Sequence, residues 1–216
     1  MKKLAFYLIY SVFFTPFTIA QPLNLRIAKD QVIEHYESGA FEQECKQIID
    51  QAIDYLESNK DNFSDSKSII FDVDDTILLA FYHLKTLDFC DYCGDRLFNE
   101  FVTRANAPTI VAVKQLYDYC ANNNYHIFFL TSRSEELYDA TIQNLALHGY
   151  VKFDRLICKS HNEKHLKAIQ YKSSQRAQLV SQGYDIVACV GDQPTDLEGP
   201  YVGYVVKIPN YTHILK

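Results

Sequence analysis

Residues 68–76 read SIIFDVDDT, an apolar run that ends in three aspartates and a threonine. Continuous apolar runs of this length are typical of strands buried on both faces, as in a parallel sheet. We therefore predict a strand over residues 68–72. Because side chains two residues apart in an extended strand share a face, Asp72 and Asp74 can point the same way.

Neighbouring carboxylates such as those of Asp72 and Asp74 repel each other, and each raises the pKa of the other. The arrangement is costly unless a cation lies between the two groups or one of them stays protonated. A metal-assisted nucleophile beside a general acid meets these conditions, whereas the simpler alternative is a helix cap or a solvated turn. The position of both residues directly after an apolar strand favours the functional interpretation.

The rest of the chain alternates apolar runs with helical patterns. Further strands are predicted at residues 127–130, 155–158, 186–190 and 204–208. Helices are predicted at residues 109–122, 134–148 and 173–182, and at residues 28–56, where Gly39 divides the pattern in two. Such alternation indicates a layered α/β fold with a parallel sheet and right-handed crossovers. Ligands of such sheets bind beyond the carboxyl ends of the strands, which is where the polar residues gather.

Polar residues at two more places have candidate roles in binding a phosphoryl group. Thr131 and Ser132 follow the second strand, where a hydroxyl and free backbone amides could hold a phosphoryl oxygen. Ser and Thr also commonly cap helices. Lys172 is expected where a helix opens and could offer its ammonium to a phosphate or a carboxylate. A single lysine is more often a surface residue.

The fourth strand is followed by Asp192 and, one turn later, by Asp196, with Pro194 suited to the first turn of a short helix. Both carboxylates can therefore face one site. A hard divalent cation such as Mg²⁺ prefers oxygen ligands of this kind, although a capped turn explains the spacing equally well. Taken together, the polar loops supply a nucleophile, a hydroxyl, a cation and a pair of metal-binding carboxylates.

This ordered set resembles the four motifs of the haloacid-dehalogenase (HAD) superfamily. Asp72-x-Asp74 followed by Asp75-Thr76 is similar to the first motif of its phosphatase branch, Thr131 to the second, Lys172 to the third and Asp192-x-x-x-Asp196 to the fourth. The residues at 35–41, 171–193 and 207–210 resemble more narrowly the class B/class C-type acid phosphatases of subfamily IIIB, a group that includes the plant vegetative storage proteins.

The resemblance implies a HAD-like Rossmannoid fold and a role for each motif. By this resemblance, Asp72 is expected to attack phosphorus, while Asp74 protonates the leaving alcohol and then activates water. Thr131 and Lys172 hold the phosphoryl oxygens, and Ser132 is the neighbouring candidate for the same task. Mg²⁺ is bound by Asp72, the backbone carbonyl of Asp74 and Asp192. Asp196 supports the metal site or orients Lys172.

The implied activity is that of a Mg²⁺-dependent acid phosphatase acting on small phosphate monoesters, with nucleotides among the candidates, through an aspartyl-phosphate intermediate. HAD dehalogenases lack an acid at the position of Asp74, so its presence points to phosphate esters. The alternative is a non-catalytic storage or binding protein on the same fold. Some storage proteins have a replaced nucleophile, whereas Asp72 is intact here, which favours activity.

Residues 77–107 are expected to form a small helical cap. They are rich in aromatic residues, which could stack a nucleobase or simply form the core of the cap: Phe81, Tyr82, Phe89, Tyr92 and Phe98. The segment also holds Cys90 and Cys93, which lack the second pair or the nearby histidines that a structural zinc site requires. A disulfide is therefore favoured over a metal, with its connectivity left open.

The N-terminus has the pattern of a signal peptide. Two lysines precede an apolar run at residues 4–14, and Ala20 ends a plausible cleavage site, so residues 1–20 are predicted to be removed from a domain of residues 21–216. The expected location is periplasmic or secreted, without stable membrane insertion; an uncleaved anchor is the alternative. The net charge of −6 and the absence of a basic cluster argue against a nucleic-acid polymer as partner.

Overall fold

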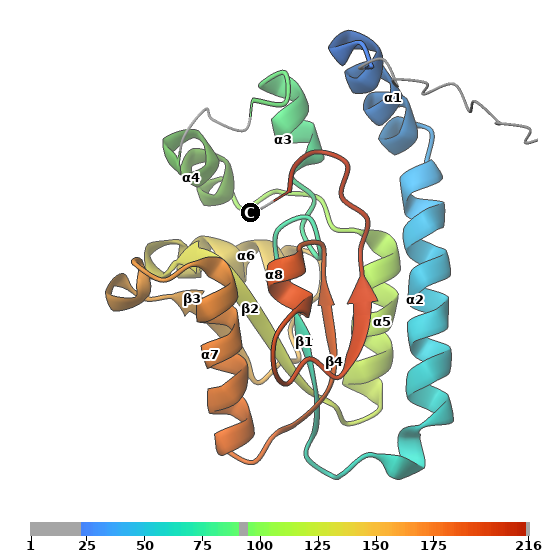
Figure 1. The fold of residues 1–216 in the computed structure, drawn as a ribbon, viewed down its shortest axis with the longest axis vertical. Helices are drawn as coiled ribbons and strands as arrows, with labels where there is room; N and C mark the ends of the chain where they lie inside the picture. The colour runs from blue at the N-terminus through green and yellow to red at the C-terminus, as the bar shows by residue number, and fades with distance from the viewer. Residues whose placement is uncertain (1–22, 91–94, 215–216) are drawn as a thin grey trace, which may run out of the picture.

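A computed structural model of the protein describes residues 23–90 and 95–214, and it has a five-stranded parallel sheet at its centre (Figure 1). The spatial order is β3-β2-β1-β4-β5, so that β1 lies in the middle. The strands are β1 Lys67–Phe71, β2 His126–Ser134, β3 Arg155–Lys159, β4 Asp185–Gly191 and β5 Tyr204–Lys207. The predicted α/β fold class is therefore confirmed.

Helices cover the sheet, and some of them lie beyond the carboxyl ends of its strands (Figure 1). They are α1 Leu25–Glu37, α2 Ala40–Ser58, α3 Phe81–Thr86, α4 Asp95–Thr103, α5 Val111–Asn122, α6 Tyr138–Leu147, α7 Ala168–Ser181 and α8 Pro194–Leu197. Within the described ranges, none of these helices is long and apolar enough to cross a bilayer.

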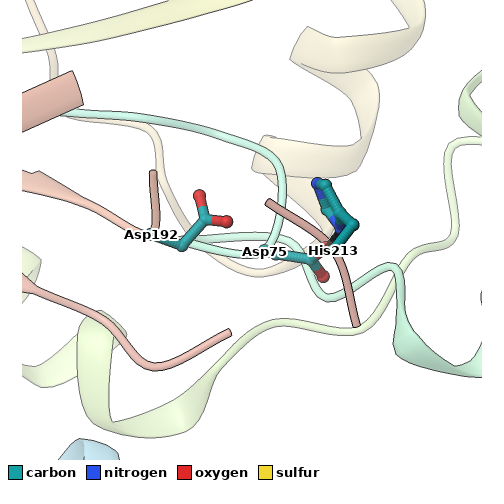
Figure 2. A group of neighbouring side chains, drawn as sticks. All are labelled: Asp75, Asp192 and His213. Carbon is teal, nitrogen blue, oxygen red and sulfur yellow. Dashed lines mark ion pairs between the residues drawn. The ribbon is translucent and has the colours of Figure 1, made fainter. Parts of the chain in front are cut away.

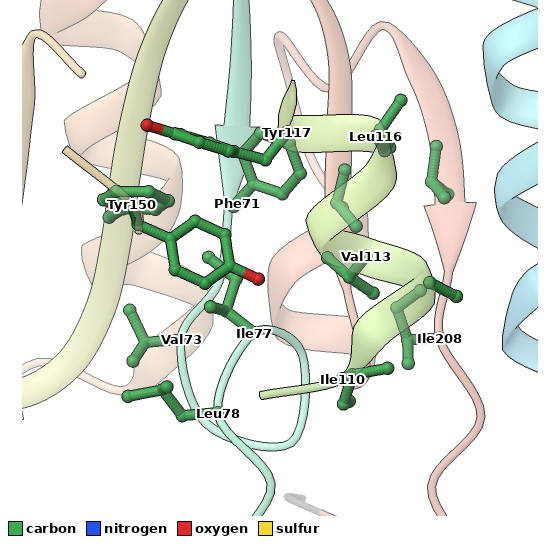
Figure 3. Packing of buried hydrophobic residues seen from close by; sticks show 14 of the residues in the cluster. Phe71, Val73, Ile77, Leu78, Ile110, Val113, Leu116, Tyr117, Tyr150 and Ile208 are labelled. Carbon is green, nitrogen blue, oxygen red and sulfur yellow. The ribbon is translucent and has the colours of Figure 1, made fainter. Parts of the chain in front are cut away.

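The two faces of the sheet are packed against different helices because successive residues of a strand point to opposite sides. Ile69 and Phe71 of β1 belong to the larger core cluster, which includes buried residues of α2 and α5; Figure 3 shows part of it. Ile70 belongs to a smaller cluster with Tyr171 and Leu179 of α7. All three β1 residues are at least 96% buried, which explains the continuous apolar run.

The expected division of the first helical region at Gly39 is confirmed, since Gly39 has a positive φ of 83° between α1 and α2. Several boundaries were predicted wrongly. The helix expected from residue 173 begins at Ala168, where the side chain of Gln170 accepts a hydrogen bond from the backbone N–H of Lys167 (3.2 Å). Lys172 therefore lies inside α7. Strand β2 also continues past Leu130, because Ser134 still pairs with Lys159 of β3.

Helices α3 and α4 lie beyond the carboxyl ends of the strands, within the segment expected to form a cap (Figure 1). Phe81 is fully buried and stacks on Tyr36 of α1, with ring centroids 4.1 Å apart, so it belongs to the main core. Cys90 is disulfide-bonded, as favoured from the sequence. The other cysteines within the described ranges are free thiols: Cys45, Cys120, Cys158 and Cys189.

Some of the sequence predictions concern residues outside the described ranges. These are the signal peptide at residues 1–20, the ring of Tyr92 and the thiol of Cys93. They stay predictions.

Candidate active site

The centre of the site is a buried ion pair between Asp72 and Lys172, which are 100 residues apart in the sequence. Asp72 comes directly after β1, and its backbone N–H still donates to the carbonyl of Val190 on β4 (2.9 Å). Helix α7 brings in Lys172, whose Nζ donates to Asp72 Oδ1 (2.5 Å) and to Asp196 Oδ1. The predicted cation is thus placed against the predicted nucleophile.

Three carboxylates share this buried space with one ammonium group. Oxygens of Asp72, Asp192 and Asp196 lie within 4.8 Å of one another, which confirms that the fourth-strand pair faces Asp72. Burial raises the pKa of Asp72, and the carboxylate of Asp196 raises it further. Burial alone would lower the pKa of Lys172, but the carboxylates of Asp72 and Asp196 raise it. Lys172 cannot neutralise three carboxylates, and this oxygen-only donor set fits a hard divalent cation.

Asp192 is held in place by neighbouring polar side chains. Its Oδ1 accepts from the Thr76 hydroxyl (3.1 Å), and its Oδ2 accepts from the amides of Gln193 (2.5 Å) and Asn210 (2.6 Å). The ammonium of Lys207 donates to the backbone carbonyl of Asp192. Such surrounding hydrogen bonds orient a metal ligand. None of these four partners was identified as a site residue from the sequence.

Gly191 lets Asp196 approach the end of β4. A Cβ at this glycine would lie 2.3 Å from Asp196 Cβ and 2.6 Å from its Oδ2. The same Oδ2 accepts from the backbone N–H of Gln193 (2.9 Å). Pro194 begins α8, as predicted, and the side chain of Asp196 caps the turn before it. Asp196 is therefore both a cap and a partner of Lys172.

Asp74 lies on the open side of the site and is paired with Arg133. The guanidinium donates to both carboxylate oxygens, with Nη2 2.7 Å from Oδ1 and Nε 3.1 Å from Oδ2. The Arg133 side chain is only 1% exposed and also donates to the hydroxyl of Thr141 (2.9 Å), whereas Asp74 is 27% exposed. This fork-on-fork geometry fixes the orientation of the Asp74 carboxylate.

Arg133 was not identified as a site residue from the sequence, although one signal was available. It lies two residues after Thr131 in β2, so both side chains share one face of the extended strand. Thr131 is buried, and its Oγ1 accepts from the Arg133 backbone N–H (3.1 Å) and lies 3.5 Å from Asp74 Oδ2. The structure thus gathers Asp72, Asp74 and Thr131 at one edge of the sheet.

A cavity of about 900 Å³ opens above Asp74. Ser132 is exposed and lines it, as does Arg133 from the same strand. The opposite wall comes from the helices beyond the strand ends and includes His83, Leu84 and Phe98. Asp74 and Asp75 line the cavity on the side of the strand ends, and its volume is large enough for a small organic molecule.

A buried carboxylate beside a lysine, a carboxylate cluster suited to a divalent cation and a second, accessible carboxylate at the mouth define an α/β phosphohydrolase of the HAD type. Residues 20–214 match the family described as "HAD superfamily, subfamily IIIB (Acid phosphatase)". The chain belongs to that family, as its motifs predicted, and phosphoric monoester hydrolysis is the reaction class of the family.

Known relatives agree with this assignment. The chain is 32% identical to "Acid phosphatase 1" of Solanum lycopersicum over 187 residues, which cover 84% of this chain and 72% of the relative. It is 28% identical to "Vegetative storage protein 1" of Arabidopsis thaliana, over 77% of this chain and 68% of that protein. The fold is similar to a class C acid phosphatase from Bacillus anthracis, solved with tungstate bound (TM-score 0.73, 18% identity, 88% of this chain and 87% of that one).

Proposed function

We propose that the protein is a Mg²⁺-dependent acid phosphatase that hydrolyses small phosphate monoesters through an aspartyl-phosphate on Asp72. The observation that carries the proposal is the contact of the Lys172 ammonium with both Asp72 and Asp196 beside the Asp192 carboxylate. A family match over nearly the whole chain supports the same reaction class.

In the first step Asp72 attacks phosphorus and displaces the alcohol. Lys172 and the Thr131 hydroxyl, which contact Asp72 and Asp74, would bind the phosphoryl oxygens, and Ser132 is a further candidate at the cavity wall. Positioning and neutralisation of charge are the main requirements of phosphoryl transfer. A bound Mg²⁺ ion supplies further positive charge there, and Asp72, the backbone carbonyl of Asp74 and Asp192 are the groups that would hold it.

Asp74 acts as the general acid for the leaving alcohol and then as the base for the attacking water. Its greater exposure than Asp72, 27% against 8% for the side chains, suits a group that meets both solvent and substrate. Arg133 orients its carboxylate through two parallel hydrogen bonds. We infer that Arg133 is a positioning residue for Asp74.

Residues 77–107 act as the cap over the cavity and contribute to its selectivity. His83, Leu84 and Phe98 form an apolar and aromatic wall opposite Ser132 and Arg133. Such a wall suits a monoester whose organic part is flat or apolar, and nucleotides belong to this group. The ring of Phe98 is accessible for such a contact, unlike that of Phe81.

The protein is proposed to act outside the cytoplasm after removal of residues 1–20. The charged start, the short apolar run and Ala20 support this. A storage role on the same fold is the competing hypothesis, because vegetative storage proteins are among the relatives. The intact carboxylate set around Lys172 favours catalysis over storage.

Hydrolysis of p-nitrophenyl phosphate tests the proposal. The purified protein should release p-nitrophenolate with Mg²⁺, lose this activity in EDTA and regain it when Mg²⁺ is restored. Asp72→Asn should abolish turnover and keep the fold, because an amide is a poor nucleophile and a weaker metal ligand. Full activity after exhaustive chelation, recovery with zinc alone, or near-normal turnover of Asp72→Asn would contradict the proposal.

A further inference from the structure

A second group of side chains of the kinds that bind metal ions lies beside the carboxylates of Asp72, Asp192 and Asp196. Figure 2 shows Asp75, Asp192 and His213, which come from the loop after β1, the turn after β4 and the C-terminal segment. One ligand atom from each of them lies within 4.8 Å of the other two. Neither Asp75 nor His213 has a role in the phosphoryl transfer proposed above.

Asp75 has a buried oxygen that lacks a partner. The residue is 3% exposed, and its Oδ1 accepts from the backbone N–H of Ala80 (2.8 Å). Its Oδ2 is fully buried and accepts no hydrogen bond from any residue that the structure describes. Leaving a buried acceptor unsatisfied costs about 1–3 kcal/mol, and more for a charged group. This oxygen points into the space shared with Asp192 and His213, so the missing partner belongs there.

The distance from His213 to this oxygen suits two ligands of one ion. Nδ1 lies 3.8 Å from Asp75 Oδ2, which is beyond hydrogen-bonding range. Two ligands that each lie about 2.0–2.2 Å from a zinc ion are roughly 3–4 Å apart. Nδ1 also lies 3.1 Å from the hydroxyl of Thr212, which itself donates to Asn210 Oδ1 (2.8 Å).

The backbone of His213 is fixed on both sides. Its N–H donates to Oδ1 of Asn210 (3.2 Å), and its carbonyl accepts from the Gln193 amide (3.4 Å). Because Asn210 and Gln193 also bind the Asp192 carboxylate, the C-terminal segment and the turn after β4 form one connected unit. The imidazole is therefore held next to the two carboxylates by contacts that do not need an ion.

We propose that Asp75, Asp192 and His213 form a site for a divalent transition-metal ion, with Zn²⁺ as the best fit. An imidazole nitrogen with two carboxylates is a donor set that suits zinc, whereas the oxygen-only set around Asp72 suits Mg²⁺. Asp192 belongs to both sets.

The ion would tie the C-terminal segment to the loop after β1. Its three ligands come from parts of the chain more than 20 residues apart, and Asp75 and His213 approach each other to 3.8 Å without a hydrogen bond. Binding to the folded state alone stabilises that state by mass action. Zinc should therefore raise the melting temperature of the protein in the presence of saturating Mg²⁺.

Counting bound metal tests the site without reference to turnover. The purified protein is dialysed against Zn²⁺ with Mg²⁺ in large excess. The number of zinc ions bound per chain is then measured by elemental mass spectrometry. We expect one retained zinc ion for the wild type, none for His213→Ala, and one for His165→Ala, which removes an exposed histidine between β3 and α7. His213→Asp, which supplies a new carboxylate ligand, should restore binding.

The outcomes are distinct. The site is absent if the wild type retains no zinc, or if His213→Ala retains as much as the wild type. Loss of zinc in His213→Asp as well as in His213→Ala would also overturn it, provided that both variants melt cooperatively. Anomalous scattering at the zinc edge should place the ion between the three side chains. A protein that retains zinc but hydrolyses no phosphate ester would uphold this site and contradict the proposed function.

Discussion

At the scale of single residues, the two aspartates that follow β1 have different surroundings. Asp72 is buried against the Lys172 ammonium, whereas Asp74 is partly exposed and forms an ion pair with the Arg133 guanidinium. A carboxylate that must attack phosphorus benefits from a fixed cation beside it. A carboxylate that must deliver a proton to a departing alcohol needs access to the cavity instead. The structure therefore supports the division of labour proposed for this pair.

The role of Asp74 can be tested by changing the leaving group. In Asp74→Asn the phosphorylation step should slow far more for an alkyl monoester than for p-nitrophenyl phosphate, because p-nitrophenolate leaves largely unaided. The loss of a general acid typically costs about 10² to 10⁴ in rate. Rapid-quench kinetics on both esters measures this step, and Asp139→Asn, an exposed carboxylate on α6, serves as the control.

The second step should slow as well in Asp74→Asn, because the same carboxylate activates the water. A burst of p-nitrophenolate equal to the enzyme concentration would then precede slow turnover. Equal losses in the first step for both leaving groups would show that Asp74 is structural or electrostatic. In that case the proton donor would have to be another group.

At the scale of secondary-structure elements, the strand ends carry the site, and close packing there is as important as charge. Gly191 ends β4. A residue with a Cβ would not fit at this position, because the side chain of Asp196 occupies the space beside it. Gly191→Ala would push Asp196 away from the Lys172 ammonium. Overpacking of this kind typically costs about 1–3 kcal/mol.

We predict that Gly191→Ala loses phosphatase activity by more than its loss of stability explains. At a temperature where the variant is still folded by circular dichroism, its kcat should fall by at least about tenfold, which corresponds to 1.4 kcal/mol. Val205→Ala on β5, which trims a half-exposed side chain, should keep normal activity. Normal kcat in Gly191→Ala would mean that the position of Asp196 does not matter for turnover.

The sequence allowed the strand ends and the four motifs to be predicted, because apolar runs and the acids that follow them are local patterns. The Arg133–Asp74 pair could not be predicted in this way, since it joins residues 59 positions apart in the sequence. The start of α7 was placed too late because Lys172 was expected where the helix opens, whereas Gln170 caps the helix earlier. Contacts made by Asn210 depend on the path of the C-terminal segment, which leaves no local signal.

At the scale of the whole molecule, the fold gathers more negative than positive charge at one edge of the sheet. Burial, followed by the carboxylate of Asp196, raises the pKa of both Asp72 and Asp192 above 3.8. A pKa that is higher in the folded state means a contribution to stability that is present below the unfolded pKa. That contribution is lost as the pH rises through the folded pKa.

We therefore predict that the metal-free protein loses stability relative to Asp72→Asn as the pH rises above about 4. Each titrating group contributes at most about 1.4 kcal/mol per pH unit to this difference. Urea unfolding of both proteins in EDTA, from pH 4 to pH 7, measures it, and added Mg²⁺ should reduce the slope. Parallel stability curves for the two proteins would show that Asp72 ionises without penalty.

The proposed function requires that Asp72 becomes phosphorylated during turnover. The most direct measurement is to mix the protein with p-nitrophenyl phosphate and Mg²⁺, quench with acid within milliseconds and locate the added phosphoryl group by mass spectrometry of peptides. We expect one phosphoryl group on the peptide that contains Asp72, and none in Asp72→Asn. A wild-type enzyme that turns over without this labelled peptide, or a label that persists in Asp72→Asn, would show that Asp72 is not the nucleophile.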